Sequence, residues 1–375
     1  MRVTIDSLEQ QIAPLREAML QAVDAYWPNR MDMHRGELIE AFRKLCIRIG
    51  QQQSSGQKAP IAYIHFSFLR TWLLQDRVIY SIEAYDDRWY VDRNECLELL
   101  ELPWLYPLLQ SFKQDLGHAL FRQVPDTEID AIVLREFTVL HQYIREWIRS
   151  LVPELIALPE FLAIERADVL RIRAGEFKDF SEQLWMEDCT DRQAAELKSW
   201  LEEKRSSDCM NSDLRGLDLS GGQYEGIDLR YSHCSGGDFS GSNFQGSICV
   251  GTDFSGSKLT GADFSQSLLY DANFSGCDLS SAKLAEAVGG ARFFHEGMVL
   301  GFYGIDFSNA NLQGANLLFA DLAGAEFQGA NLSGALILKQ DALQWNLSEE
   351  QRRSITWMEE DESGVPVPVQ VQLRE

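Results

Sequence analysis

The 375-residue sequence lacks the common motifs of catalysis and of metal binding. It contains no P-loop, no dinucleotide-binding fingerprint, no nucleophile elbow and no HExxH motif. Its six histidines do not pair at the spacing of metal ligands, and its glycine pairs are not followed by a helix that would bind phosphate. We therefore expect a protein that is not an enzyme and that binds no cofactor or metal.

Long apolar runs and a regular cysteine pattern are also absent. No apolar stretch approaches the roughly 18 residues of a membrane-spanning helix, and no signal-peptide pattern is present. The seven cysteines are odd in number and include no CxxC pair, so we interpret all of them as free thiols in a reducing compartment. These absences predict a cytoplasmic bacterial protein without a membrane partner.

Positive charge is scarce, because 34 Lys and Arg residues stand against 57 Asp and Glu residues, for a net charge of −23. A chain this acidic is not drawn to nucleic acid or to anionic membranes by simple electrostatics. We expect no direct nucleic-acid binding. The acidity is equally explained by competition with DNA for a basic protein surface and by solubility alone.

What the sequence does contain is a period of five residues in its C-terminal third. One run, GTDFS-GSKLT-GADFS-QSLLY-DANFS-GCDLS-SAKLA, covers 251–285, and a second, IDFSN-ANLQG-ANLLF-ADLAG-AEFQG-ANLSG, covers 305–334. A Leu or Phe forms the centre of a unit, a small residue lies two positions earlier, and Asp or Asn lies between them. Centres recur from Leu214 to Leu284 and from Phe307 to Ile337, which makes 22 units. Neither a helix nor a strand has this period, so it indicates a stacked repeat architecture.

The repeat resembles the A(D/N)LXX consensus of the pentapeptide repeat family. The resemblance implies a right-handed, four-sided β-helix with four units per turn. At about 4.8 Å between stacked strands, about 5.5 turns would form a rod about 26 Å long. We therefore predict two domains: a mainly helical domain at 1–205 with a small hairpin near 78–92, and a β-helix at 206–342. The β-helix is followed at 343–375 by a C-terminal capping helix, expected at 348–360, and an acidic tail. Amphipathic patterns predict helices in the first domain at 7–26, 32–49, 104–116, 126–151 and 163–187.

Residues 20 positions apart should stack in columns on a four-sided coil. The positions before the centres then give Asp218, Asp238, Lys258 and Asp278 on one face, and Asp213, His233, Asp253 and Asn273 on the next. Four of these carboxylates form the candidate acidic interaction column: Asp218, Asp238, Asp253 and Asp278.

One face of the predicted coil is apolar. Its outward positions include Tyr231, Ile248, Val250, Leu268 and Tyr270, with Ile248 over Leu268 and Val250 over Tyr270. An apolar column on a soluble rod marks a contact surface. We expect this candidate docking face to be covered, either by another part of the same chain or by a dimer or protein partner.

The register of the repeat breaks between Leu284 and Phe307, which are 23 residues apart, so 286–304 contains a looped-out insertion. It either contacts a partner as a lid over the coil or packs as a loop without one. The candidate contacts in it are Phe293, Phe294, Phe302 and Tyr303. In the C-terminal segment, the candidates for a cap or for a homodimer contact are Trp345, Ile355 and Trp357.

Some members of the pentapeptide repeat family act on type II topoisomerases. The resemblance and the acidity therefore predict a non-catalytic, protein-binding DNA mimic that acts on DNA gyrase or topoisomerase IV. It would modulate the enzyme or protect it from an antibiotic that poisons it. Two alternatives remain open. The chain is a rigid interaction scaffold whose helical domain binds a protein or peptide, or its first domain binds a small molecule or catalyses a reaction, which a buried polar pocket there would favour.

Overall fold

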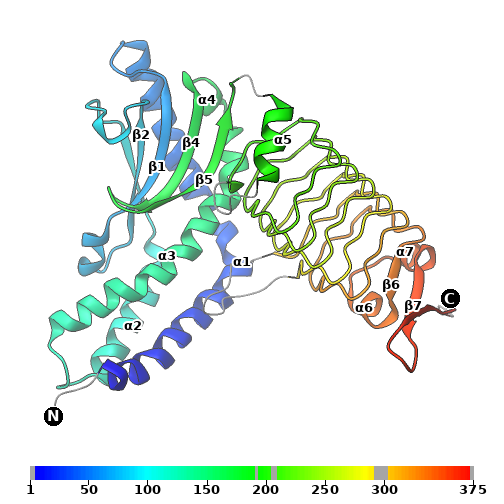
Figure 1. Cartoon of the computed structure of the whole chain (residues 1–375). Coiled ribbons are helices and arrows are strands. Elements are labelled where there is room, and N and C mark those ends of the chain that lie inside the picture. Colours follow the sequence, from blue (N-terminus) through cyan, green and yellow to red (C-terminus); the bar gives the residue numbers. More distant parts are fainter. Residues whose placement is uncertain (1–4, 191–192, 204–208, 291–302, 372–375) are drawn as a thin grey trace. The chain divides into compact units, whose positions relative to one another are not determined.

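The computed structural model of the chain describes residues 5–190, 193–203, 209–290 and 303–371 and divides into two compact units, Met1–Thr190 and Asp191–Glu375 (Figure 1). The first unit combines helices with a five-stranded sheet, and the second is built on the repeat. Three of the candidate insertion contacts, Phe293, Phe294 and Phe302, lie outside the described residues.

The first unit begins with one long helix and continues with strands and helices in turn. In chain order its elements are α1 (Ile5–Ser54), β1 (Ile61–Phe68), β2 (Ile79–Tyr85), β3 (Leu97–Glu101), α2 (Tyr106–Ala119), α3 (Asp126–Ile156), α4 (Pro159–Leu162), β4 (Arg166–Glu176) and β5 (Ser181–Asp188). Short 3-10 helices cover Arg70–Gln75, Trp89–Val91 and Pro103–Leu105.

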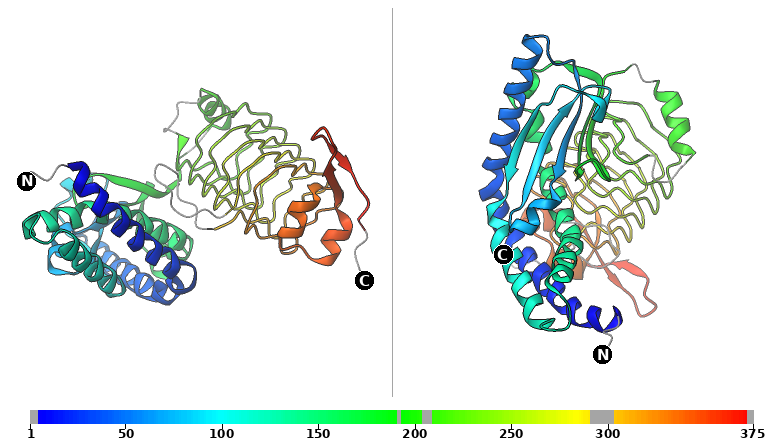
Figure 2. Two further views of the ribbon diagram at one scale, coloured as in Figure 1. Left: turned by 90° about the horizontal axis from the view of Figure 1, so that it is seen from below. Right: turned by 90° about the vertical axis from the view of Figure 1, so that its left-hand side faces the viewer.

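The strands form a single mixed sheet in the order β3-β2-β1-β4-β5, seen together in Figure 2. Strand β1 pairs parallel with β4, and the other neighbours are antiparallel. Side chains alternate between the two faces of a strand. Phe66 of β1 stacks on Phe42 of α1 with ring centroids 6.3 Å apart, and Phe68 stacks on Phe137 of α3 at 4.7 Å. Helices α1 and α3 therefore cover the face that carries the even-numbered residues of β1.

Three predictions for the first unit need correction. The helices expected at 7–26 and 32–49 are one helix, and the helix expected at 163–187 is the strand pair β4 and β5. The hairpin expected near 78–92 is wrong, because β2 pairs with β1 and β3 instead. After β2, the carboxylates of Asp86 and Asp92 accept backbone N–H groups of Arg88 (2.9 Å) and Asp86 (3.1 Å), which turns the chain before it can pair back.

The second unit confirms the predicted right-handed four-sided β-helix. Helix α5 (Ala194–Glu202) precedes the coil, and isolated parallel bridges join residues 20 apart, such as Asp213 to His233. Across the insertion the spacing becomes 33, as between Asn273 and Asp306. The turn is completed before the insertion, since Gly289 N donates to Asp321 O at 2.8 Å. Residues 286–289 therefore belong to the coil and not to the predicted insertion.

The unit centres fill the coil interior, and hydroxyl groups of the small inward residues hydrogen-bond to buried carbonyls. Phenylalanines stack along it, with ring centroids 4.7 Å apart for Phe244 and Phe264 and 5.0 Å apart for Phe254 and Phe274. A small residue two positions before a centre points inward, and Thr252 Oγ1 there donates to the Leu229 carbonyl of the previous turn at 2.8 Å. The small residue thus prevents overpacking and, where it has a hydroxyl, satisfies a buried carbonyl.

The C-terminal segment covers the open end of the coil. Its elements are β6 (Leu336–Leu338), α6 (Lys339–Gln344), α7 (Glu349–Ser354), β7 (Thr356–Glu360) and β8 (Pro366–Pro368). The helix expected at 348–360 ends at Ser354, because the chain then pairs as β7 with β6. A capping box opens α7: Gln351 N donates to Ser348 Oγ at 3.2 Å, and Ser348 N donates to Gln351 Oε1 at 2.9 Å.

Candidate functional surfaces

The Asp or Asn before a unit centre has a structural task. Its Oδ1 accepts the backbone N–H two residues later, as in Asp253 to Ser255 (3.0 Å) and Asn273 to Ser275 (2.9 Å). Asparagine offers the same Oδ1 as aspartate, so the turn does not require the negative charge. Where aspartate occupies this position, its negative charge is not needed to form the turn.

The structure separates the four carboxylates of the candidate acidic interaction column. Asp218, Asp238 and Asp278 share one column, but Lys258 lies between them and its Nζ is 3.5 Å from Asp238 Oδ2. Asp253 lies in the neighbouring column. The Asp253 column contains four acidic residues: Asp213, Asp253, Asp306 and Glu326. Sequence reasoning missed Asp306 and Glu326, because the insertion hides their register.

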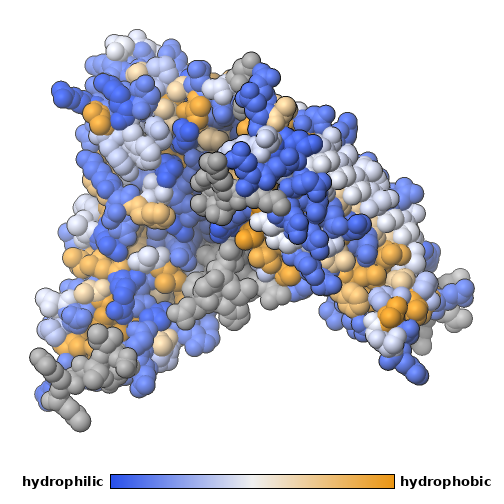
Figure 3. Space-filling model, viewed as in Figure 1, coloured by the Kyte–Doolittle hydropathy of each residue, from blue (hydrophilic) through white to orange (hydrophobic). Residues whose placement is uncertain are grey.

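Hydrogen bonds keep the carboxylates of the first column ionised. Those from Ser220 lower the pKa of Asp218, and those from Ser240 lower the pKa of Asp238. Burial acts in the opposite direction on Asp278, but hydrogen bonds from Ser280, Thr260 and Asn311 leave its pKa lowered. The visible face of the coil is largely hydrophilic, with apolar residues gathered toward the C-terminal cap (Figure 3).

The candidate docking face consists of two different sets of side chains. Ile248 and Leu268 are half-buried in one column, where they follow Asp228. Tyr231, Val250 and Tyr270 occupy the adjoining corner and are 8%, 0% and 2% exposed. The next residue after Val250 is Gly251, where a Cβ atom would lie 2.6 Å from the Tyr231 ring, so the tyrosine requires glycine there. What this face binds stays a proposal.

The remaining predicted contacts lie at the insertion and in the cap. Tyr303, at the end of the insertion, is 54% exposed, and its backbone pairs with that of Asp271, whose N–H donates to Tyr303 O at 3.2 Å. Trp345 extends the phenylalanine stack, with its ring centroid 5.6 Å from that of Phe327. Ile355 and Trp357 are each 7% exposed in the same core. These three C-terminal side chains therefore pack within the cap of their own chain.

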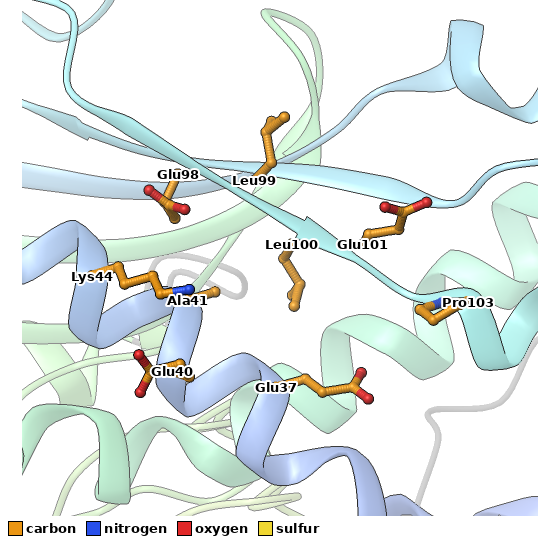
Figure 4. A pocket seen from close by; sticks show the side chains of 9 residues that line it. All are labelled: Glu37, Glu40, Ala41, Lys44, Glu98, Leu99, Leu100, Glu101 and Pro103. Atoms are coloured by element: carbon orange, nitrogen blue, oxygen red, sulfur yellow. The ribbon is translucent and has the colours of Figure 1, made fainter.

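The first unit has a groove between α1 and the edge strand β3 (Figure 4). Its volume is about 490 Å³, and acidic side chains from both elements line it. Arginines already pair with the strand carboxylates, with Arg48 2.9 Å from Glu98 and Arg77 2.9 Å from Glu101. In the described part of the chain, no group of three or more His, Cys, Asp or Glu side chains is arranged to hold a metal ion.

Two further observations concern the sequence predictions. The seven cysteines, all within the described residues, form no disulfide. Among the described helices, none combines the length and apolar character that crossing a membrane requires.

The stacked four-sided coil defines a solenoid repeat protein. A family model described as pentapeptide repeats matches it in eight copies, over residues 207–246, 247–284 and 302–336. The second unit of the chain thus carries pentapeptide repeats. No curated protein matches the chain.

Several solved structures are similar to the chain. A pentapeptide repeat protein from the thylakoid lumen of Arabidopsis thaliana is 27% identical, over 37% of this chain and 74% of that chain, with a TM-score of 0.21. Rfr23 from the cyanobacterium Cyanothece 51142 is 19% identical, over 37% and 95% of the two chains, with a TM-score of 0.24. Full-length QnrB1, a plasmid-mediated fluoroquinolone resistance protein, is 17% identical, over 42% and 94%, with a TM-score of 0.15.

Proposed function

We propose that the chain is a non-catalytic binding protein whose acidic coil occupies a basic protein surface that otherwise binds DNA. The partner is a type II topoisomerase, DNA gyrase or topoisomerase IV, and the effect is modulation or protection from a poison such as a quinolone. The proposal rests on one observation. Aspartates occupy positions at which asparagine accepts the same hydrogen bond of the turn, as Asn273 does in the Asp253 column.

The distribution of charge supports this proposal. Between residues 211 and 342 there are 15 acidic and 6 basic residues, so the repeat region carries a net charge of −9. Neighbouring positions in a column are about 4.8 Å apart, whereas duplex DNA carries one charge per roughly 1.7 Å. One column is therefore less densely charged than DNA, and mimicry needs two adjacent columns, those of Asp238 and Asp253, to face the partner together.

The experiment is a DNA gyrase supercoiling assay with the full chain titrated in, with and without a quinolone. We expect inhibition of supercoiling or protection from the drug. Replacing Asp218, Asp238, Asp253 and Asp278 together by Asn should weaken this effect at least about tenfold, because the turns stay intact while four charges are lost. Raising the salt concentration should weaken the wild-type effect as well.

A matched control removes four exposed charges away from these columns, by changing Glu225, Glu349, Glu350 and Glu362 to Gln. This variant should act like the wild type. An undiminished effect in the aspartate variant would contradict the role of the four carboxylates. No effect of the wild type at micromolar concentrations would contradict the choice of partner.

The second candidate function is an interaction scaffold. The half-buried apolar pair Ile248 and Leu268 favours it, because apolar side chains on an outer face of the coil suit a contact with another protein. Apolar contacts, unlike ionic ones, are insensitive to salt. A protein partner whose binding persists at high salt and is lost in the Ile248→Ser, Leu268→Ser variant would identify this function. A homodimer through the C-terminal segment belongs to the same proposal, and it would have to use the exposed Leu343 and Val365, since Trp345, Ile355 and Trp357 are buried.

A further inference from the structure

The sheet of the first unit has one polar face, opposite the face that α1 and α3 cover. The odd-numbered residues of β1 lie on it, and the strand register places three rows of side chains across β2, β1 and β4. The rows are Tyr85–Tyr63–Arg171, Glu83–His65–Arg173 and Ser81–Ser67–Gly175. Burying a polar strand face at the centre of a sheet costs free energy unless its polar groups have hydrogen-bond or charge partners. The partners of each group on this face are therefore informative.

Two arginines on this face have no carboxylate partner. Neither Arg171 nor Arg173 makes an ion pair with a described residue, although the chain carries an excess of acidic groups. Arg173 instead donates from Nε to Ser181 Oγ at 2.9 Å and from Nη2 to Ser181 O at 2.6 Å. Their guanidinium carbons lie 5.8 Å from the Tyr63 ring centroid and 5.2 Å from that of Trp89, and these two rings stack with centroids 4.3 Å apart. Both cations therefore rest against one pair of aromatic rings.

Two carboxylates that the strand register and electrostatics place around Arg173, Glu83 and Glu182, are already occupied. Glu83 accepts the hydroxyls of Ser67 (2.8 Å) and Tyr85 (2.7 Å). Glu182 lies on the opposite face of the sheet, where Arg145 approaches it at 3.2 Å. Burial lowers the pKa of Arg173, and the charge of Arg171 acts in the same direction. An anion between the two guanidinium groups would relieve this repulsion.

His65 presents a hydrogen-bond acceptor toward the same face. Its Nδ1 is 2.6 Å from Ser67 Oγ, and the only proton of that hydroxyl goes to Glu83. Nδ1 must therefore donate to Ser67, which leaves a lone pair on Nε2. The His65 side chain is 0% exposed, and its Nε2 has no hydrogen-bond partner. Burial lowers the pKa of His65 to about 4, so the ring is neutral.

Neighbouring donors also lack acceptors. The Tyr90 hydroxyl, the Trp89 indole Nε1 and the Ser81 hydroxyl are buried and make no hydrogen bond of normal geometry. Burial raises the pKa of the Tyr90 hydroxyl, although the Trp89 indole acts on the Tyr90 oxygen and lowers that pKa. The Tyr90 ring stands edge-on to His65, with ring centroids 6.1 Å apart. Buried groups of this kind usually have a partner in the native protein. The cluster thus combines two cations that have no carboxylate partner, neutral donors and one acceptor, and Arg173 keeps only its Nη1 free of the bonds to Ser181.

We propose that this polar sheet face binds a phosphorylated small molecule that carries a hydroxyl group, such as a nucleotide or a sugar phosphate. The phosphate accepts from Arg171, Arg173 and the Tyr90 hydroxyl, since two cations and neutral donors complement a dianion with several acceptor oxygens. A ligand hydroxyl donates to His65 Nε2. The first unit is then a ligand-binding domain joined to the coil, independent of which partner the coil binds.

The test is isothermal titration calorimetry of the full chain with four probes: AMP, ribose 5-phosphate, adenosine and inorganic phosphate. We expect the two phosphate esters to bind, adenosine to fail, and inorganic phosphate to bind more weakly because it has no separate sugar hydroxyl to donate to His65 while the arginines hold its oxygens. AMP binding tighter than ribose 5-phosphate would identify a nucleotide site, and equal binding would identify a sugar-phosphate site.

Three variants decide whether the named residues form the site. The double variant Arg171→Gln, Arg173→Gln should weaken binding at least about tenfold, and Tyr90→Phe about threefold. Arg166→Gln is the matched control on β4, because Arg166 pairs with Glu187 at 3.4 Å and should leave binding unchanged. If the double variant unfolds, Arg171→Gln alone replaces it, since no hydrogen bond to the Arg171 side chain would be lost.

Two results would overturn the proposal. One is the absence of binding of both phosphate esters to the folded wild-type chain at about 5 mM, which corresponds to negligible affinity. The other is wild-type binding by the folded arginine variants, which would place any phosphate site elsewhere.

Discussion

Asp278 offers the sharpest test of why this repeat accepts either Asp or Asn. Its Oδ1 accepts Ser280 N at 3.1 Å and Asn311 Nδ2 at 3.0 Å, and its Oδ2 accepts Thr260 Oγ1 at 2.9 Å. In Asp278→Asn the Oδ1 bonds persist, and the new Nδ2 can donate to the Thr260 hydroxyl with its direction reversed. In Asp278→Ala all three hydrogen bonds are lost.

The expected energies differ accordingly. A net hydrogen bond contributes about 0.5–1.5 kcal/mol, and this site is partly exposed, so Asp278→Ala should destabilise the coil by about 2 kcal/mol. Asp278→Asn should cost less than about 0.5 kcal/mol. Native-state hydrogen exchange measures both changes in the coil separately from the first unit, through amides such as Leu259 N–H, which donates to Asp278 O at 2.8 Å.

The same pair of variants has a pH signature. The pKa of Asp278 is lowered in the folded state, so its contribution to stability is present above the unfolded pKa and is lost as the pH falls through the folded value. Asparagine does not titrate, and Asp278→Asn should remove this part of the acid dependence. If Asp278→Asn lost as much stability at neutral pH as Asp278→Ala, the reasoning would be refuted, because the negative charge itself would then hold the turn.

Three further predictions concern the C-terminal cap. Trp345→Ala should destabilise the last turns of the coil by about 3–5 kcal/mol, because it removes a buried aromatic ring from the Phe327 stack, and faster exchange confined to 305–337 would show it. Ser348→Ala should cost about 1 kcal/mol through loss of the capping box, measured by the same method. Val369 N donates to Trp357 O, so the odd-numbered residues of this segment hydrogen-bond to β7. The even-numbered Pro366 and Pro368 face the open edge of the sheet and offer no N–H there. Replacing both prolines by Val should therefore permit strand pairing between molecules and a mass that rises with concentration in light scattering.

Each of these predictions has an outcome that contradicts it. Uniform destabilisation of both units by Trp345→Ala would show that the cap does not act locally. An unchanged exchange rate in Ser348→Ala would mean that water replaces the capping hydroxyl. A monodisperse proline variant at all concentrations would show that something other than the missing N–H groups protects the β8 edge.

The sequence by itself determined the coil, because every interaction that builds it repeats at short range. Each unit contacts units 20 residues away, so the period of five, the inward small residue and the Asp or Asn at the turn are visible in one dimension. The capping box at Ser348 was predictable for the same reason, since both of its hydrogen bonds join residues three apart. The candidate acidic residues could be chosen only as far as the register was known, which ended at the insertion.

Only the tertiary structure decided the rest. The segment 166–188 forms strands because β1, about a hundred residues earlier, offers it a parallel partner, and no local pattern encodes that pairing. The number of residues inserted after Gly290 decides that Asp306 and Glu326 join the column of Asp253. The polar sheet face likewise arises from three strands distant in sequence, which bring Glu83, His65 and Arg173 into one row. Chemistry that depends on such non-local registers becomes visible only when the strands are placed side by side.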